Sequence, residues 1–366
     1  MSAFLRLFSV IPRRAKNIIH RPRFLIMEEL FKKALEHNEA TKKPLSAVPW
    51  KPDQPYAQPF FTYDRSKQAW TPAEPKALGN KDSRNGINRL RLYSWNIDFM
   101  LPFAKARMDA ALEHLHELTS KLPSSTATVI FLQECVEEDL ATIGEKEWVR
   151  DKFNVTDVDG RNWQAYYGTT TLIDRRLDIT SLFRVHYEKT RMERDALVVE
   201  TALPSPVVGA SSRTVRLCNS HLESLAVDPP LRPAQVRVLA THMRAPGVHA
   251  GLAAGDFNAI QPFDRTLHAD HGLKDAYLEL GGREDSEEGY TWGQQAATSL
   301  RERFGCSRMD KVYFTGAGLR LHSFERFGED VLVGGEEERK GIRELGFEKP
   351  WITDHLGVVA EFEVVD

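Results

Sequence analysis

From residue 89 onward, short apolar runs alternate with segments in which apolar residues recur at helical spacing. The apolar runs predict β-strands over residues 89–95, 128–132, 197–203, 214–220, 251–254, 308–314 and 357–365. Helices are predicted over residues 104–122, where Met108, Leu112 and Leu115 share one face, and over residues 232–242. Strands that alternate with helices are typical of a layered α/β domain, which we expect to occupy residues 89–366.

Residues 1–27 have a different composition, with arginine and lysine but no carboxylate among apolar residues such as Leu5 and Phe8. This pattern is typical of a mitochondrial presequence, although Pro12 and Pro22 limit the length of any helix there. The alternative is an unstructured basic tail, with an upstream start before Met27. A helix is predicted over residues 28–37.

Residues 44–75 are rich in both proline and aromatic side chains. Proline favours extended backbone, whereas the aromatic content is too high for a purely disordered segment. We therefore predict an arm that lies on the main domain, with a polar break over residues 79–88. The expected organisation is a basic extension (1–27), a short helix and arm (28–88) and the main domain (89–366).

The chain of 366 residues carries 49 Lys and Arg against 52 Asp and Glu, a net charge of −3, which excludes a generally basic nucleic-acid-coating protein. Cys135, Cys218 and Cys306 are odd in number and widely spaced, which argues against a disulfide framework. No apolar run reaches the roughly 18 residues of a membrane span. We expect a soluble intracellular enzyme, in the nucleus or the mitochondrion, and a solvated loop at the charged residues 335–340.

Polar residues stand at the ends of several predicted strands, and a buried strand that ends in a polar residue places it on the rim of its sheet, where layered α/β domains bind ligands. They are Asn96, Asp98, Glu134, His221, Asp256 and Asn258, with Asp354 and His355 just before the last strand.

The residue types suit one kind of chemistry. Asp98 and Glu134 are hard oxygen ligands, which favour Mg²⁺ or Mn²⁺. The amides and His221 can donate hydrogen bonds to phosphoryl oxygens, and Asp256 with Asn258 can orient and deprotonate a water. Asp354 or His355 can stabilise developing negative charge. Together these features predict metal-assisted hydrolysis of a phosphoester.

Seven strings occur in order along residues 89–366: SWNID (94–98), LQE (132–134), NSHLES (219–224), GDFN (255–258), YTW (290–292), RMDKVYF (308–314) and TDHLGV (353–358). In this they resemble the endonuclease/exonuclease/phosphatase superfamily. The resemblance implies a deoxyribonuclease I-like fold, a four-layer α/β sandwich of two mixed β-sheets flanked by helices, with residues 89–366 as the catalytic domain.

Within the superfamily the strings look most like the type 2 tyrosyl-DNA phosphodiesterase branch, which removes a topoisomerase tyrosine from a DNA 5′ phosphate. The resemblance implies roles for the following residues: Asp98 and Glu134 as the metal site, Asn96 as a phosphate and metal-shell ligand, His221 and Ser224 as phosphate contacts, Asp256 as the acid/base positioned by Asn258, His355 paired with Asp354 as transition-state stabiliser, and Asp310 as the orienting acid. Trp292 is either a core anchor or a wall on which a base or tyrosine stacks.

The sequence also departs from that branch. Phe99 replaces a glycine and is expected to crowd the floor of the site. Residues 225–226 and 259–260 are apolar where the branch carries arginines that contact DNA. Because phosphate contacts provide much of a protein's affinity for nucleic acid, the core chemistry transfers better than the DNA substrate. Arg232 is interpreted as structural or as a substrate contact.

The function expected from the sequence is a Mg²⁺-dependent phosphodiesterase, acting as a monomer on 5′-phosphotyrosyl linkages at DNA ends in the repair of topoisomerase adducts. The alternatives are another phosphoesterase of the same fold (an abasic-site nuclease, an RNA or nucleotide phosphodiesterase, or a lipid or inositol phosphatase) and, less favoured, an inactive scaffold. A scaffold has no physical need for a buried cluster of charges that repel one another.

Overall fold

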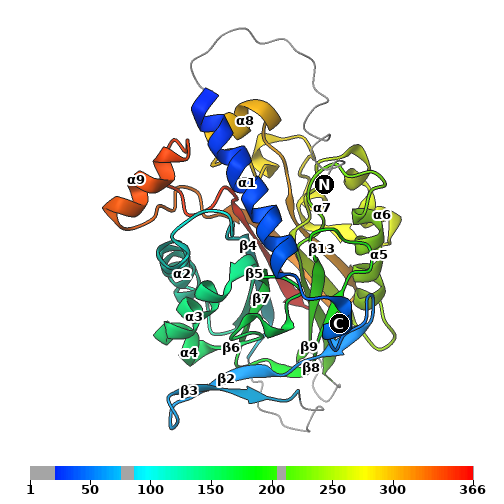
Figure 1. Cartoon of the computed structure of the whole chain (residues 1–366). Coiled ribbons are helices and arrows are strands. Elements are labelled where there is room, and N and C mark those ends of the chain that lie inside the picture. Colours follow the sequence, from blue (N-terminus) through cyan, green and yellow to red (C-terminus); the bar gives the residue numbers. More distant parts are fainter. Residues whose placement is uncertain (1–20, 76–85, 204–211, 366) are drawn as a thin grey trace.

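The computed structural model describes residues 21–75, 86–203 and 212–365, which form two β-sheets with helices on their outer faces (Figure 1). The strands are β1 (Pro55–Ala57), β2 (Phe60–Asp64), β3 (Ala69–Ala73), β4 (Arg89–Asn96), β5 (Thr126–Val136), β6 (Phe153–Val155), β7 (Tyr167–Asp174), β8 (Asp178–His186), β9 (Asp195–Leu203), β10 (Arg213–Ser220), β11 (Ala250–Asp256), β12 (Lys274–Asp275), β13 (Asp310–Gly316), β14 (Leu319–Phe327) and β15 (Gly357–Val364). The α-helices are α1 (Arg21–Thr41), α2 (Ala104–Ser120), α3 (Glu137–Glu145), α4 (Glu147–Lys152), α5 (Arg232–Met243), α6 (Leu267–Asp270), α7 (Ala276–Glu279), α8 (Thr298–Phe304) and α9 (Glu336–Glu344).

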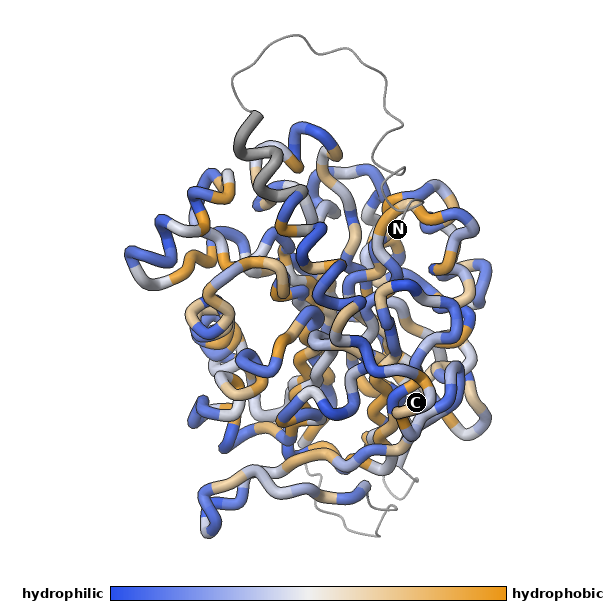
Figure 2. Tube along the Cα trace, viewed as in Figure 1, coloured by the Kyte–Doolittle hydropathy of each residue, from blue (hydrophilic) through white to orange (hydrophobic). Residues whose placement is uncertain are grey.

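The two sheets pack face to face. One has the strand order β1-β8-β9-β10-β11-β13-β12 and the other β14-β15-β4-β5-β7-β6-β2-β3. Leu92 and Val129 from one sheet and Val199 and Leu252 from the other belong to the buried core between them. Further apolar clusters lie under α2 and α3 on one outer face and under α5 on the other. Figure 2 shows hydrophobic positions concentrated along the central strands. The predicted four-layer sandwich of two mixed sheets is confirmed.

The proline- and aromatic-rich arm is part of both sheets. β1 pairs with β8 and forms the edge of one sheet, while β2 pairs with β6 and β3 forms the edge of the other, so the arm supplies edge strands to each sheet. Proline is tolerated at such edges because its missing N–H removes no hydrogen bond to a neighbouring strand. The arm therefore packs against the main domain, as its aromatic content predicted, but by strand pairing as well as by side chains.

The structure differs from the sequence prediction in several elements. Strands β7, β8 and β14 were not predicted; β7 carries Thr169, Thr170 and Thr171, which obscure any apolar alternation. Residues 335–340 were predicted to form a loop, and this prediction was wrong. The three glutamates of the first turn of α9 are favoured by the helix dipole, and Ile342 anchors the helix.

The first helix is longer than predicted, since residues 21–27 already belong to α1. Residues 1–20, which hold most of the possible presequence, lie outside the described residues. Within the described ranges, none of the helices combines the length and apolarity that a membrane crossing requires.

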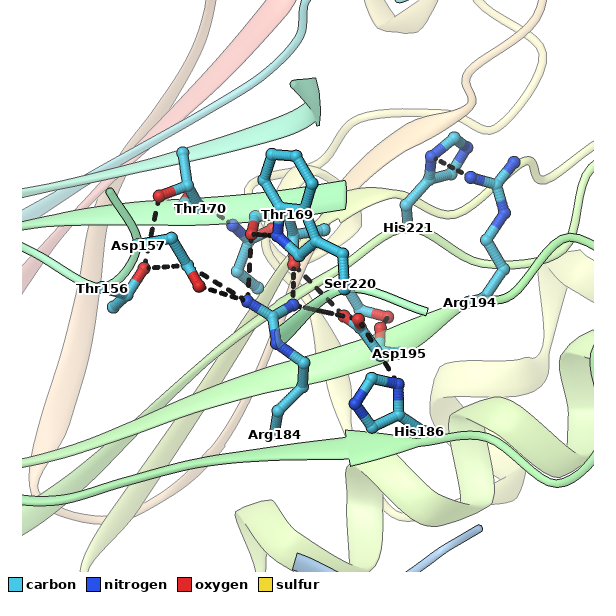
Figure 3. Close-up of polar contacts among 12 residues, drawn as sticks. Thr156, Asp157, Thr169, Thr170, Arg184, His186, Arg194, Asp195, Ser220 and His221 are labelled. Carbon is cyan, nitrogen blue, oxygen red and sulfur yellow. Dashed lines mark hydrogen bonds and ion pairs between the residues drawn. The ribbon is translucent and has the colours of Figure 1, made fainter. Parts of the chain in front are cut away.

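A buried guanidinium joins the two sheets (Figure 3). Arg184 of β8 donates to both carboxylate oxygens of Asp195 at 2.9 Å and to Asp157 at 3.1 and 3.2 Å. It also donates to the Thr169 hydroxyl of β7 at 2.9 Å, and the arm approaches it through Gln58. A fully buried cation between two carboxylates is tolerated only because the charges and hydrogen bonds of the three groups compensate for the water that each of them loses.

Replacing Arg184 with Met should lower the free energy of unfolding by about 3–5 kcal/mol, because two buried carboxylates lose their cation. Urea denaturation measures this change. The triple variant that adds Asp157→Asn and Asp195→Asn should recover part of the loss, and Lys121→Ala, which breaks an exposed ion pair with Glu117, should cost less than about 0.5 kcal/mol. A loss below about 1 kcal/mol for Arg184→Met would contradict the proposed role of this network.

Candidate active site

The strand pairing brings the polar strand ends to one edge of the sandwich. β4 and β5 are parallel, with Asn96 opposite Gln133, so Asp98, which follows β4, and Glu134, at an irregularity in the pairing of β5 with β7, lie at the same edge. β10 and β11 are also parallel, which does the same for His221 and Asp256.

Two further strands begin at this edge. β13 runs antiparallel to β11 and pairs its first residue, Asp310, with Asp256. β15 starts two residues after His355 and pairs Val358 with Ser94 of β4. The edge therefore collects the predicted residues from strands that are distant in sequence.

Local backbone geometry turns these side chains inward. Asp98, Glu134 and Asn258 all have positive φ angles, of 58°, 58° and 48°, so the chain bends sharply at each of them. Gly255 has a φ of 154°, and a Cβ there would lie 1.7 Å from the carbonyl oxygen of Ser220. The glycine of the GDFN string is thus required by the close approach of β10 and β11.

Asp256 is the centre of the hydrogen-bond network. Its Oδ2 accepts from Asn96 Nδ2 at 3.0 Å and lies 3.3 Å from His221 Nε2, while its Oδ1 accepts from the backbone N–H of Asn258 at 2.8 Å. Burial alone would raise the pKa of Asp256, but the positive charge of His355 and the hydrogen bond from His221 hold that pKa well below its ordinary value. Asp256 is therefore an ionised carboxylate.

Asp98 and Glu134 lie side by side, held by backbone amides. Met100 N donates to Asp98 Oδ1 and Phe99 N to Glu134 Oε2, each at 3.0 Å. Burial raises the pKa of Asp98 well above its ordinary value, and the charges of Asp354 and Glu134 raise it further. This site concentrates negative charge away from water.

A divalent cation fits this donor set. In the described part of the chain, ligand atoms of Glu134, His221 and Asp256 lie within 4.8 Å of one another, so buried carboxylate oxygens converge at this edge. Asp98 is not in that group. The charge of Glu134 nevertheless raises the pKa of Asp98, because the two carboxylates are close together. A cation would relieve this repulsion, and oxygen-rich ligands favour Mg²⁺ or Mn²⁺.

His355 hydrogen-bonds to Asp310, the residue expected to be the orienting acid, and forms a longer ion pair with Asp354. Its Nδ1 lies 2.8 Å from Asp310 Oδ2, whereas its Nε2 is 3.7 Å from Asp354 and 3.8 Å from Asp256. Burial lowers the pKa of His355, but the three carboxylates outweigh burial and raise it well above its ordinary value. Asp354 instead accepts from the indole N–H of Trp292 at 2.7 Å. His355 is thus a cation oriented by Asp310.

His221 has the opposite character because of Arg194, a residue in none of the sequence motifs (Figure 3). Arg194 Nη1 lies 2.7 Å from His221 Nδ1, and its Nη2 donates to the Ser224 hydroxyl at 3.0 Å. Because a guanidinium only donates, His221 Nδ1 accepts and the proton sits on Nε2, which faces Asp256. Burial and the charge of Arg194 lower the pKa of His221, so it is a neutral donor.

An aromatic wall, defined here as Phe99, Tyr166 and Tyr167, flanks the Asp98–Glu134 pair. The Phe99 ring stacks on Tyr167 with centroids 3.9 Å apart and contacts Tyr166 edge-on. Phe99, which was expected to crowd the floor of the site, contributes its ring to this wall.

The rim of the site carries apolar residues. Leu225 and Ala259 are half-buried, while Ala226 and Ile260 are exposed. Arg232 is buried and forms an ion pair with Asp264 at 2.7 Å, which matches the structural interpretation.

Comparison with known proteins agrees with this architecture. The model of the endonuclease/exonuclease/phosphatase family matches residues 93–355. Similar solved structures include truncated TDP2 of Caenorhabditis elegans, with 22% identity and a TM-score of 0.53 over 75% of this chain and 98% of that chain. D. rerio TDP2 complexed with single strand DNA product has 19% identity and a TM-score of 0.55 over 75% and 99%.

The human Nocturnin catalytic domain with bound sulfate anion has 16% identity and a TM-score of 0.51, over 76% of this chain and 95% of that chain. A comparison with curated proteins gave no match. The low identities to solved structures show the shared fold, and the family model carries the assignment. Because that model covers well over half of the chain, the protein belongs to the endonuclease/exonuclease/phosphatase family, a family of phosphoesterases.

Proposed function

We propose that the protein is a Mg²⁺-dependent phosphodiesterase that hydrolyses 5′-phosphotyrosyl linkages at DNA ends, and thereby acts on topoisomerase adducts. The observation that carries the proposal is the set of contacts around Asp256, an ionised carboxylate between a neutral histidine and a cationic one. Because one imidazole is neutral and the other is cationic, the acid role and the base role that hydrolysis needs can be taken by different groups.

Each side chain of the site has a role in this proposal. Asp256 accepts the proton of the attacking water. Asn258 and Asn96 help to orient this water. His221 donates its Nε2 proton in a hydrogen bond to a phosphoryl oxygen. The His355 cation, oriented by Asp310, stabilises the negative charge that develops in the transition state. Asp98 and Glu134 would hold the metal ion, which supplies Lewis-acid stabilisation of the phosphoryl group when bound.

The aromatic wall supports an aromatic leaving group. Phe99 and Tyr167 already stack on each other beside Glu134, so the site offers aromatic surface for a tyrosyl ring. The likeness to TDP2 structures, one of them with a single strand DNA product, supports the same substrate class.

The apolar rim favours a second candidate. Leu225, Ala226 and Ile260 provide no cation for a DNA backbone, and this suits a smaller phosphoester such as a nucleotide. The likeness to the Nocturnin catalytic domain is compatible with this alternative.

The test is a panel of substrates with the purified full chain. The proposal expects Mg²⁺-dependent release of tyrosine from a 5′-tyrosyl oligonucleotide, loss of activity in EDTA and recovery with Mg²⁺ or Mn²⁺. An abasic duplex, an RNA oligonucleotide, a dinucleotide cofactor and an inositol phosphate represent the alternatives. Preferential turnover of one of these would replace the tyrosyl proposal, and no turnover of any would favour the scaffold.

Glu134→Gln keeps the shape of the side chain but removes one negative ligand. We expect Mn²⁺ binding, measured by titration calorimetry, to weaken at least about tenfold, and kcat to fall at least about 100-fold. Glu138→Gln, an exposed glutamate four residues further on, is the matched control and should leave both values unchanged. Normal turnover in Glu134→Gln would refute the metal assignment.

Asp256→Asn replaces the proposed base by an amide of equal size. We expect kcat to fall at least about 100-fold with little change in KM, because general base catalysis contributes factors of this order. The exposed Asp228→Asn is the control, and urea denaturation of both variants checks that the fold is intact. If Asp256→Asn kept more than about a tenth of the wild-type rate, another group would have to accept the proton.

A further inference from the structure

Glu223 is a buried acidic residue of the NSHLES string that has no role in the proposed hydrolysis or in the candidate metal site. It stands two residues after His221, and the backbone of the intervening Leu222 is tied to the site. The Leu222 N–H donates to the carbonyl of Asp256 at 2.9 Å, and its carbonyl accepts from Asn258 Nδ2 at 3.0 Å. Because a buried carboxylate is costly unless it is hydrogen-bonded, its donors indicate what Glu223 holds in place.

The Glu223 carboxylate binds the loop between β8 and β9. Its Oε2 accepts from the Thr190 hydroxyl at 2.9 Å, and its Oε1 accepts from the backbone N–H of Arg191 at 3.0 Å. Both donors lie between His186, where β8 ends, and Asp195, where β9 begins. The carboxylate therefore fixes this loop to the chain that follows β10.

The Thr190 hydroxyl connects Glu223 to Arg194. The hydroxyl donates its single proton to Glu223, so its lone pairs remain able to accept. It accepts from the backbone N–H groups of Arg194 at 3.0 Å and Met192 at 3.3 Å. Glu193, just before Arg194, has a positive φ of 59°, a conformation that persists only where surrounding contacts hold it. The hydroxyl thus closes the turn that leads into Arg194.

This turn directs the Arg194 side chain toward His221, and the two side chains face each other in Figure 3. Arg194 Nη1 lies 2.7 Å from His221 Nδ1, and Nη2 donates to the Ser224 hydroxyl at 3.0 Å. Because a guanidinium only donates, His221 Nδ1 accepts and its proton is on Nε2. His221 Nε2 in turn lies 3.3 Å from Asp256.

Gln235 of α5 keeps Glu223 and the loop at a fixed separation. Its Oε1 accepts from the backbone N–H of Glu223 at 2.8 Å, and its Nε2 donates to the carbonyl of Lys189 at 2.8 Å. Gln235 is itself buried. The Glu223 carboxylate therefore has a defined position from which to hold Thr190.

We propose that Glu223 is a positioning residue that acts through Thr190 to hold Arg194 against His221, and thereby keeps the proton of His221 on Nε2. On this nitrogen the proton can be donated to a phosphoryl oxygen. The inference rests on the proposed phosphodiesterase function, to which it adds the group that orients one of the phosphate contacts.

A double-mutant cycle separates this role from a purely structural one. A carboxylate that only stabilised the fold would affect turnover independently of Arg194. A group that acts through Arg194 loses its effect on turnover once Arg194 has been replaced.

The variants change the link without touching His221. Glu223→Gln keeps the size of the side chain but presents an amino group where two donors point. Thr190→Val removes the hydroxyl, whereas Thr190→Ser retains it and serves as the rescue. The matched controls are Asp174→Asn and Thr201→Val, which change buried, hydrogen-bonded residues near the ends of β7 and β9 that lie away from the site.

Activity is measured with Mg²⁺ on the nitrophenyl ester of thymidine 5′-phosphate. Glu223→Gln and Thr190→Val should each lower kcat at least about tenfold, with KM within about twofold of wild type. The split is expected because the hydrogen bond from His221 strengthens as charge develops on the phosphoryl oxygen. Thr190→Ser and both controls should keep kcat within about twofold of wild type. In an Arg194→Gln background, Thr190→Val should change kcat by less than about twofold.

The position of the His221 proton is measured directly by ¹⁵N NMR of the imidazole groups in the full chain with EDTA. The His221 signals are assigned by their loss in His221→Gln. Wild type and both controls should show the proton on Nε2, whereas Glu223→Gln and Thr190→Val should show a mixture of the two neutral forms. If Glu223→Gln does not fold, the Thr190 variants test the same link.

Two results would overturn the inference while leaving the proposed function in place. One is a loss of kcat from Thr190→Val that is as large in the Arg194→Gln background as in wild type. The other is an unchanged His221 proton position in Glu223→Gln and Thr190→Val. A wild-type chain that hydrolyses none of the proposed substrates would refute the function itself, and the NMR measurement, which needs no substrate, would still decide whether Glu223 positions Arg194.

Discussion

The concentration of negative charge at one buried edge of the sandwich is the constraint on which the site depends. Asp98, Glu134, Asp256, Asp310 and Asp354 are all buried there. Carboxylates so close together repel one another, and burial removes the water that would screen them. This repulsion is offset by hydrogen bonds from backbone amides and by the His355 cation, and the donor set suits a divalent ion. A site of this kind is costly to fold and is explained by chemistry that uses the charge.

The two histidines of the site show how environment divides one residue type into two roles. His355 is surrounded by carboxylates and is held as a cation, whereas His221 receives a hydrogen bond from Arg194 and is held neutral. Because Asp256 lies between them, its proton affinity is set from both sides. The same principle of mutual compensation appears away from the site, where Asp157 and Asp195 neutralise Arg184, which joins the sheets through Thr169.

The segment that precedes the range matched by the family model is joined to the rest of the fold. The arm extends both sheets through β1 and β2, and α1 reaches the aromatic wall through His37. The rim lacks charge at Leu225 and Ile260.

The sequence by itself determined the layered fold and most of the site. Strands such as β4 and β10 end in short sequence motifs, SWNID and NSHLES, and the order of these motifs along the chain indicates the family. Buried strands are also apolar enough to be recognised from the sequence alone. Strand β7 escaped prediction because its threonine hydroxyls accept hydrogen bonds from the other sheet, from Arg184 and Asn219, and these bonds exist only once the two sheets are packed together. For the same reason only the tertiary structure selected Asp310 as the partner of His355, placed Arg194 against His221 and brought α1 to Tyr166. The pattern of apolar and polar residues in a segment reflects burial along that one element. The contacts named above join residues from several elements, and only the packing of those elements brings the residues together.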